Sequence, residues 1–200
     1  MSILIDSLRL LFAPHKAWNH IGVTRPSLMA VMMLHTLPLA LIPAVCWFYG
    51  VTQSGWVVAG TTLKLTTASA LPVCVLFYLG MVWSVLFLGF MVHWMAKTYE
   101  SETTLARGVT LISFSATPFF IAGVFGLKPV LWLDMLVGIT VSCYCIYLLY
   151  VGTPVVMRVR PSRGFLYASA VFAVALVTFV ALLGATVVLW DLGPALEYSY

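Results

Sequence analysis

Five long apolar runs constrain the fold of this chain more than any other feature of its sequence. Each is long enough to cross the hydrocarbon core of a bilayer as a helix, which takes about 20 residues. Only 8% of the residues are charged, against roughly a quarter in an average soluble domain, so most of the surface must face something other than water. The runs extend over Leu28–Val51, Ala70–Ala96, Gly108–Leu127, Val130–Val151 and Phe165–Trp190.

The spanning segments must be helices, because backbone N–H and C=O groups in hydrocarbon have to be paired within their own segment. The alternating pattern of a transmembrane β-barrel is missing from the sequence. We therefore expect an all-α, polytopic membrane helical bundle with five transmembrane helices. Three regions follow: a cytoplasmic N-terminal segment over 1–27, the transmembrane domain over 28–190, and a short non-cytoplasmic tail over 191–200.

The first thirteen residues predict a short amphipathic helix that lies on the membrane instead of crossing it. Leu8 and Phe12 share one helical face, and Asp6 lies on the other. Pro14 ends the pattern, and the stretch is too short to span. We expect an interfacial helix, followed by Trp18 at the level of the lipid headgroups.

Lysine and arginine are distributed unequally between the two sides of the predicted bundle. Eight of them lie before the first run or in the second and fourth connections, and two, Lys64 and Lys128, lie on the other side. This bias predicts a cytoplasmic N-terminus and a C-terminus on the outer side. The outer connection over 52–69 is too polar to span, and we expect a short surface helix, a re-entrant segment or an extended lead-in to the second run.

The motifs that accompany most enzymatic chemistry are missing from the sequence. It has no glycine-rich phosphate loop, no H-E-x-x-H, no CxxC and no nucleophile motif. Only six carboxylates are present, and none is expected to pair in a protected cleft, as general acid–base catalysis requires. We therefore expect neither an enzyme nor a cofactor or metal. The basic residues border apolar runs, so nucleic-acid binding is not indicated either.

Three ionisable residues form a candidate intramembrane polar site: Asp134, Lys64 and His35. Ionisable groups inside a bilayer are costly and are functional candidates for that reason. Asp134 lies about one turn inside the fourth run, so snorkelling, or pairing with Lys64 or Lys128, also explains it. His35 lies in the inner third of the first run, where a neutral imidazole bonded to a proline-freed carbonyl is the simpler interpretation. A role in transport or proton transfer stays open.

Two further groups of residues are candidates for packing and for lipid contact. Prolines free backbone carbonyls and kink spans, and small residues let helices approach closely. The kink and packing candidates are Pro38, Pro43, Pro118, Gly152 and Pro154. The lipid-contact candidates are Arg158, Arg160 and Arg163, which make a compact basic loop between the fourth and fifth runs. Near an anionic membrane surface each base is worth about 1 kcal/mol, so membrane lipids are expected partners.

Several short motifs follow one another in a fixed order across most of the chain. They are Thr62-Leu63-Lys64-Leu65, Trp94-Met95-Ala96-Lys97, Ala116-Thr117-Pro118, and Tyr147–Gly152 followed by Pro154. In these motifs and in its five runs, the chain resembles the Yip family of small five-span membrane proteins. For a bacterial member the resemblance implies the inner membrane, and it supplies no catalytic or cofactor residues.

The wider family also includes eukaryotic adaptors for small GTPases, which the resemblance associates with a long cytosolic N-terminal region. Only 27 residues precede Leu28 here, so we do not carry the GTPase partnership over. The leading hypothesis is a non-enzymatic scaffold or adaptor that acts through helix–helix and protein–protein association, as a homo-oligomer or with a membrane-protein partner. The alternatives are a small transporter or channel, using Asp134 and the kinked first span, and a lipid-organising membrane protein.

Overall fold

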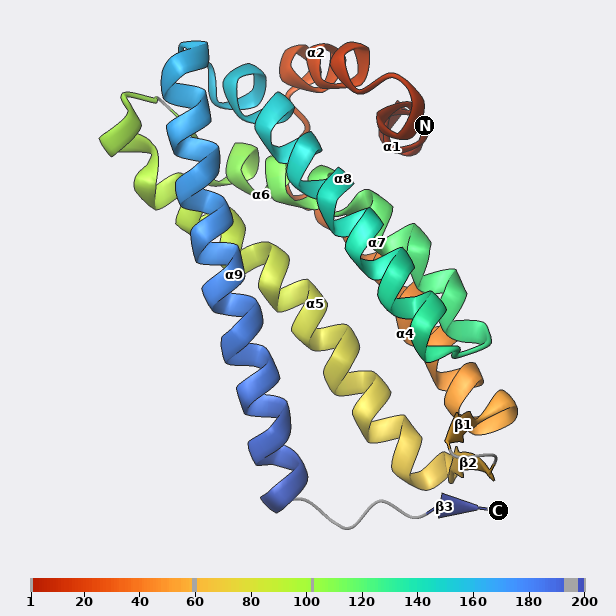
Figure 1. Ribbon diagram of the computed structural model, residues 1–200. Coiled ribbons are helices and arrows are strands. Elements are labelled where there is room, and N and C mark those ends of the chain that lie inside the picture. Colours follow the sequence, from red (N-terminus) through yellow and green to blue (C-terminus); the bar gives the residue numbers. More distant parts are fainter. Residues whose placement is uncertain (1, 59–60, 102, 193–197, 200) are drawn as a thin grey trace.

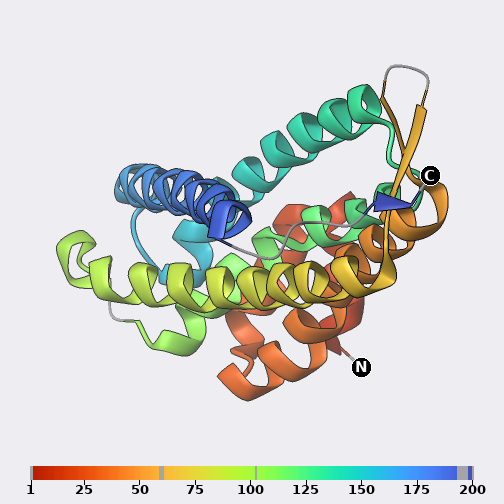
Figure 2. The ribbon, with the colours of Figure 1, turned by 90° about the horizontal axis from the view of Figure 1, so that it is seen from below.

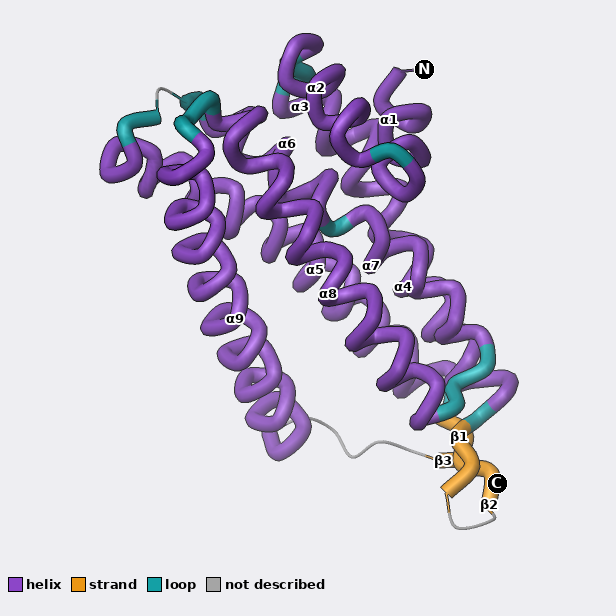
Figure 3. Tube along the Cα trace, turned by 45° about the horizontal axis from the view of Figure 1, so that its top comes forward, coloured by secondary structure: helices purple, strands orange, loops and turns teal. Residues whose placement is uncertain are grey.

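The computed structural model describes residues 2–58, 61–101, 103–192 and 198–199, and most of them are helical (Figure 1). The architecture is the all-α membrane bundle expected from the apolar runs. Two short helices, α1 (Ser2–Phe12) and α2 (Pro14–Thr24), lie across one end of the bundle. The strands gather at the opposite end (Figure 3). We call these the α2 end and the sheet end.

Four single helical segments are long and apolar enough to cross a membrane: Leu28–Ser54, Thr67–Tyr99, Leu131–Met157 and Pro161–Thr186. A further pair is bent by 40° between Leu105–Ser115 and Thr117–Leu127. Counted as one broken span, this pair completes the five that the sequence predicts. Pro118 lies in the first turn after the break, where its missing N–H cannot continue the hydrogen bonds of the preceding helix.

The spans are built from several consecutive elements. The first comprises α3 (Leu28–Val31), the π-helical turn η1 (Met32–Thr36), α4 (Leu37–Tyr49) and the π-helical turn η2 (Gly50–Ser54). The second comprises α5 (Thr67–Met95) and the 3-10 turn η3 (Ala96–Tyr99). The broken span comprises α6 (Leu105–Ser115), α7 (Thr117–Ala122) and the 3-10 turn η4 (Gly123–Leu127). The last two are α8 (Leu131–Met157) and α9 (Pro161–Leu192).

The outer connection over 52–69 contains a β-hairpin, so of the alternatives expected there the extended one agrees with the structure and the surface helix is wrong. β1 (Trp56–Val58) pairs antiparallel with β2 (Thr61–Leu65), and β3 (Tyr198–Ser199) pairs with the other edge of β2. The valines and threonines of this stretch favour extended backbone. Gly55, with a φ of 71°, turns the chain out of η2. Within the predicted tail, residues 193–197 and 200 lie outside the described part of the chain.

The core of the bundle surrounds α6, whose residues from Gly108 to Ser115 are all buried. Glycines bring the neighbouring helices close to it: a Cβ on Gly108 would collide with the carbonyl oxygen of Gly89 in α5. Three other glycines, Gly80, Gly138 and Gly184, have nothing within 4 Å of the position of a Cβ, so they lie on outward faces. Seen from below, α9 stands at one edge of the bundle and the hairpin at another (Figure 2).

Candidate functional site

A cluster of four polar side chains lies fully buried between the first span and the broken span. His35 and Thr36 come from the π-helical turn η1, and Ser113 and Thr117 come from the two sides of the break between α6 and α7. Each of the four has 0% of its surface exposed. π-Helical turns inside α-helices occur frequently at functional sites, and this one carries both first-span members of the cluster.

The members of the cluster satisfy one another. His35 Nδ1 lies 2.8 Å from Ser113 Oγ, and His35 Nε2 lies 3.0 Å from Thr117 Oγ1. Thr36 Oγ1 lies 2.6 Å from Ser113 Oγ. The imidazole also stacks on Phe114, with ring centroids 4.3 Å apart. A neutral imidazole has one donor and one acceptor nitrogen, so the two hydroxyls at its ends occupy its whole hydrogen-bonding capacity.

The break in the third span places these hydroxyls. Ser113 and Thr117 are four residues apart, so they lie on the same face of the helical path, and that face meets η1 of the first span. His35 therefore bonds side chains of another helix, and the predicted bond to a proline-freed carbonyl of its own helix is wrong. The sequence signal for this contact is a serine and a threonine four residues apart, with the threonine directly before Pro118. The prediction from sequence did not include it.

The structure does not bring the predicted polar site together. His35 is bonded to Ser113 and Thr117 in the interior, whereas Lys64 lies in β2, opposite Ser199, at the sheet end. Asp134 lies in the first turn of α8 and is half-buried. In the described part of the chain it forms no ion pair with Lys64 or Lys128, so the pairing suggested for it is not present.

Several of the proline and glycine candidates lie at helix contacts. A Cβ on Gly123 would collide with the ring of Pro43, which is buried inside α4. The ring of Pro154 packs on Gly164 at the start of α9, with Pro154 Cβ 3.0 Å from the position of a Cβ on that glycine. Pro38 is exposed in the first turn of α4.

Gly152 receives the indole of Trp18. A Cβ on this glycine would lie 2.6 Å from Trp18 Cε2, and the indole packs edge-on against Phe114 with centroids 6.4 Å apart. Trp18 is fully buried, so its indole packs inside the protein, and its depth at the level of the headgroups stays a prediction. The glycine leaves a notch in α8, and the tryptophan of α2 fills it.

The helix α1 is attached to α2 and α8 by polar contacts, beside the buried side chain of Leu10. Asp6 is buried, and its carboxylate lies 3.0 Å from His20 Nδ1 of α2. The hydroxyl of Tyr144 in α8 donates to the carbonyl oxygens of Leu10 and Leu11. Phe12, in contrast, is 88% exposed, so the apolar side of α1 is left free to enter a membrane interface.

The arginines of the predicted basic loop have different surroundings at the α2 end. Arg163 forms an ion pair with Glu100, which follows η3. The hydrogen bond from Arg163, assisted by the charge of Arg160, lowers the pKa of the Glu100 carboxyl below its usual range. Arg158 caps the C-terminal end of α8 in the left-handed backbone region, with a φ of 54°.

The described residues contain no group of three histidines, cysteines or carboxylates able to hold a metal ion. The buried cluster joins the first span to the broken span by hydrogen bonds among its own side chains.

Comparison with known proteins identifies the family. The family model for the Yip1 domain matches residues 8–182. The chain belongs to the Yip1 domain family.

Two curated relatives support this membership. The inner membrane protein YohC of Escherichia coli K12 is 38% identical over 160 residues, which is 80% of this chain and 82% of the relative. The protein of the same name in Escherichia coli O6:H1 matches with the same identity and coverage. No solved structure matches the chain. Together with the apolar helices, the relatives support a multi-pass protein of the inner membrane.

Proposed function

We propose that this Yip1-domain protein is a non-enzymatic scaffold or adaptor of the inner membrane. It acts by associating through its outward helix faces with a second copy of itself or with another membrane protein. The observation that carries the proposal is the closure of the buried polar cluster: both ring nitrogens of His35 are bonded within the protein. The polar atoms of the cluster therefore hold the first span and the broken span together.

The outward faces support association. Gly80 of α5, Gly138 of α8 and Gly184 of α9 have open space where a Cβ would lie. Glycine on a membrane-facing surface lets a second helix backbone come close, which strengthens van der Waals packing between helices in lipid. Because nothing in the described chain touches these positions, larger residues there are compatible with the fold.

Crosslinking in native membranes, followed by affinity purification and mass spectrometry, tests the proposal. We expect a stoichiometric partner, or a dimer of the chain, whose yield falls severalfold in Gly80→Leu or Gly138→Leu. Val177→Ala, at an exposed position of α9, is the matched control and should leave the yield unchanged. A yield that none of the glycine variants alters would contradict association through these faces.

A small transporter or channel is the second candidate, because half-buried Asp134 lies in a span without an ion-pair partner among the described residues. Proteoliposome flux of protons and monovalent cations, measured for the wild type and Asp134→Asn, separates the two functions. The scaffold proposal expects the same background flux from both proteins. Flux above that of empty liposomes that disappears in the variant would replace it with transport.

We also infer the orientation of the protein in the membrane. Eight of its ten lysines and arginines lie at the α2 end, in α1 and α2 and in or beside the ends of the spans that meet there. The positive-inside rule then places the α2 end and the N-terminus in the cytoplasm, and the sheet end and the C-terminus in the periplasm.

A further inference from the structure

The helix α1 has a polarity opposite to that of a helix on the surface of a soluble protein. Its inner side carries two polar side chains, Asp6 and Ser7, each 3% exposed, beside the buried Leu10. Its outer side is a stripe of large apolar side chains that are between 43% and 88% exposed: Ile5, Leu8 and Phe12. A helix next to water normally buries its apolar stripe and exposes its polar residues. The outer side of α1 therefore suits an apolar environment.

The contacts of α1 place it at the level of a span. It packs against the π-helical turn η1, which begins four residues after the first span starts at Leu28. At a rise of ~1.5 Å per residue, η1 lies about 6–12 Å along that span. Met33 and Leu34 of η1 are more than half exposed and, as residues of a span, face lipid. The apolar stripe of α1 lies beside this lipid-facing surface and extends it.

The last turn of α1 receives hydrogen bonds from the interior of another span. The final four C=O groups of a helix have no partner within that helix, and the Tyr144 hydroxyl donates to those of Leu10 and Leu11. Tyr144 lies in the middle of α8 (Leu131–Met157). In hydrocarbon a free carbonyl has no water to bind, so it needs a partner from the protein. The end of α1 therefore has the hydrogen bonds that a helix end requires inside a membrane.

Basic side chains border the apolar stripe. Arg9 in the last turn of α1 and Lys16 in the first turn of α2 are exposed on either side of the turn that follows Phe12. The sole side-chain carboxylate among the first 99 residues is Asp6. It is buried, lies 3.7 Å from Arg9 and is bound to His20. An exposed apolar stripe with a basic border matches a leaflet that contains anionic lipids.

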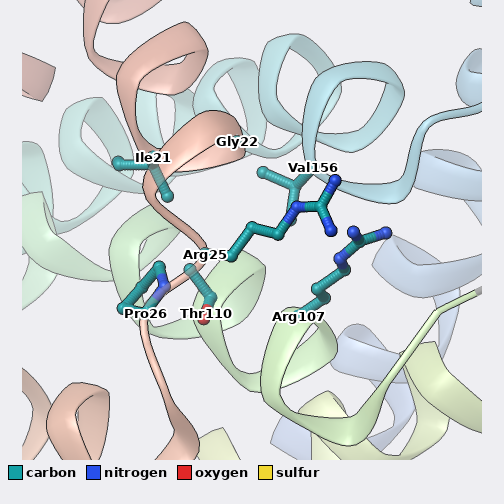
Figure 4. Close-up of a pocket in the computed structure, with 7 residues that line it drawn as sticks. All are labelled: Ile21, Gly22, Arg25, Pro26, Arg107, Thr110 and Val156. Atoms are coloured by element: carbon teal, nitrogen blue, oxygen red, sulfur yellow. The ribbon is translucent and has the colours of Figure 1, made fainter.

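The inner side of α2 packs closely on the spans. A small hollow lies there between α2, α6 and α8, and Figure 4 shows Ile21, Gly22 and Val156 among its walls. The hollow has room for about one water molecule. A lipid headgroup is much larger than that, so the lipid contacts of this region are made on its outer side.

We propose that the outer side of α1 is a lipid-binding surface that is embedded among the acyl chains of the leaflet at the α2 end and selects anionic headgroups. Its apolar stripe contacts acyl chains, and Arg9 and Lys16 contact the lipid phosphates. Amphipathic helices of this kind enter the boundary between headgroups and acyl chains by about 5–10 Å, which matches the level of η1. Because α1 is fixed to the bundle, the protein gathers anionic lipid on one side of the membrane, apart from the helix faces proposed for association.

Photo-crosslinking in nanodiscs tests the depth of this surface. In the full-length protein p-benzoylphenylalanine replaces Phe12, whose 88% exposed side chain leaves room for the larger ring. The nanodiscs contain equal amounts of phosphatidylcholine and phosphatidylglycerol, and mass spectrometry identifies each lipid adduct and the part of the lipid that is crosslinked. We expect acyl-chain adducts at position 12. Severalfold fewer should form at the control position Ser162, which is exposed in the first turn of α9. Adducts at position 12 that are no more frequent than at Ser162, or that are confined to headgroups, would overturn the embedding.

The same adducts report the selectivity for anionic headgroups. In the crosslinking protein, the ratio of phosphatidylglycerol to phosphatidylcholine adducts should fall by about fivefold for each base that is removed in Arg9→Gln and Lys16→Gln. Lys64→Gln, in β2 at the opposite end of the bundle, is the control and should leave the ratio unchanged. An unchanged melting temperature in detergent shows that the variants are folded. A ratio that stays at its original value when both bases are removed would overturn the selectivity.

Discussion

At the scale of single residues, the stability of the bundle interior depends on how buried polar atoms find partners. His35, Thr36, Ser113 and Thr117 are wholly enclosed, and each takes part in at least one hydrogen bond within the group. An unpaired polar group in such a place costs about 1–3 kcal/mol, whereas a satisfied pair contributes much less than that on balance. Removing one member is therefore more damaging than the strength of a single bond suggests.

His35→Phe keeps a ring that can stack on Phe114 and removes both ring nitrogens. It leaves the hydroxyl of Thr117 without its imidazole partner, and we expect the free energy of unfolding to fall by about 1–3 kcal/mol. Thermal unfolding of the detergent-solubilised protein measures this. Thr140→Val is the control, because that exposed hydroxyl bonds only to the carbonyl of Leu136 in its own helix. Equal losses of unfolding free energy in the two variants would show that the buried cluster stabilises the fold no more than an exposed hydroxyl does.

At the scale of elements, α2 is attached to the spans where the large side chain of Trp18 packs on Gly152, which has no side chain. The indole of Trp18 fills the notch at Gly152 and reaches the core residue Phe114. Interior packing is dense, so a side chain added at the notch has to displace the indole. The attachment explains how a short helix, of a length that is marginal on its own in water, holds one position across the end of the bundle.

Gly152→Leu should detach α2 from α8. Overpacking of this kind costs about 1–3 kcal/mol, and amide hydrogen exchange across residues 14–24 should become faster. The matched change Gly138→Leu lies in the same helix with nothing within 4 Å of the added Cβ, and it should leave that exchange as it is. Unchanged exchange in Gly152→Leu would show that the indole does not hold α2 in place.

The connection after α5 should respond to pH through Glu100. Arg163 lowers the pKa of this carboxyl in the folded protein, so the ion pair stabilises the fold above the carboxyl's ordinary pKa and is lost as the pH falls through the lowered value. The stabilisation is small, because the pair lies on the surface. We expect the wild type to melt at a higher temperature than Glu100→Gln at pH values above the ordinary pKa of the carboxyl, and the two curves to converge once the pH falls below the lowered pKa. A difference in melting temperature that persists at the lower pH would exclude this pair as its source.

At the scale of the whole molecule, charge divides the two ends of the bundle. Eight lysines and arginines lie at the α2 end, and Lys64 and Lys128 lie at the sheet end. An odd number of crossings then requires the termini to lie on opposite sides of the membrane, and this depends on the bent pair α6–α7 acting as one span.

Alkaline phosphatase fusions test both the orientation and the number of crossings. A fusion after Tyr200 should be active, because this enzyme folds only when exported, and a fusion within the connection between α8 and α9 should be inactive. A fusion to the hairpin between β1 and β2 should also be active. The reverse pattern, or activity on both sides of α9, would contradict the inferred orientation.

The membrane location of the chain, the class of its fold and the approximate limits of its spans can all be predicted from the sequence. Those properties depend on the transfer of each segment into lipid and on the pairing of its backbone, and both are local to the segment. Short motifs in a fixed order indicated the family for the same reason, since they are read along the chain.

Which residues meet one another depends on the tertiary structure. His35 and Ser113 are separated by 78 positions, and neither the polarity nor the spacing of one predicts the other as its partner. In the same way, the indole of Trp18 is buried because α8 supplies a notch for it at Gly152, 134 positions further along the chain. Contacts of this kind depend on the angles and depths at which helices pack, which the apolar pattern of a single span does not encode.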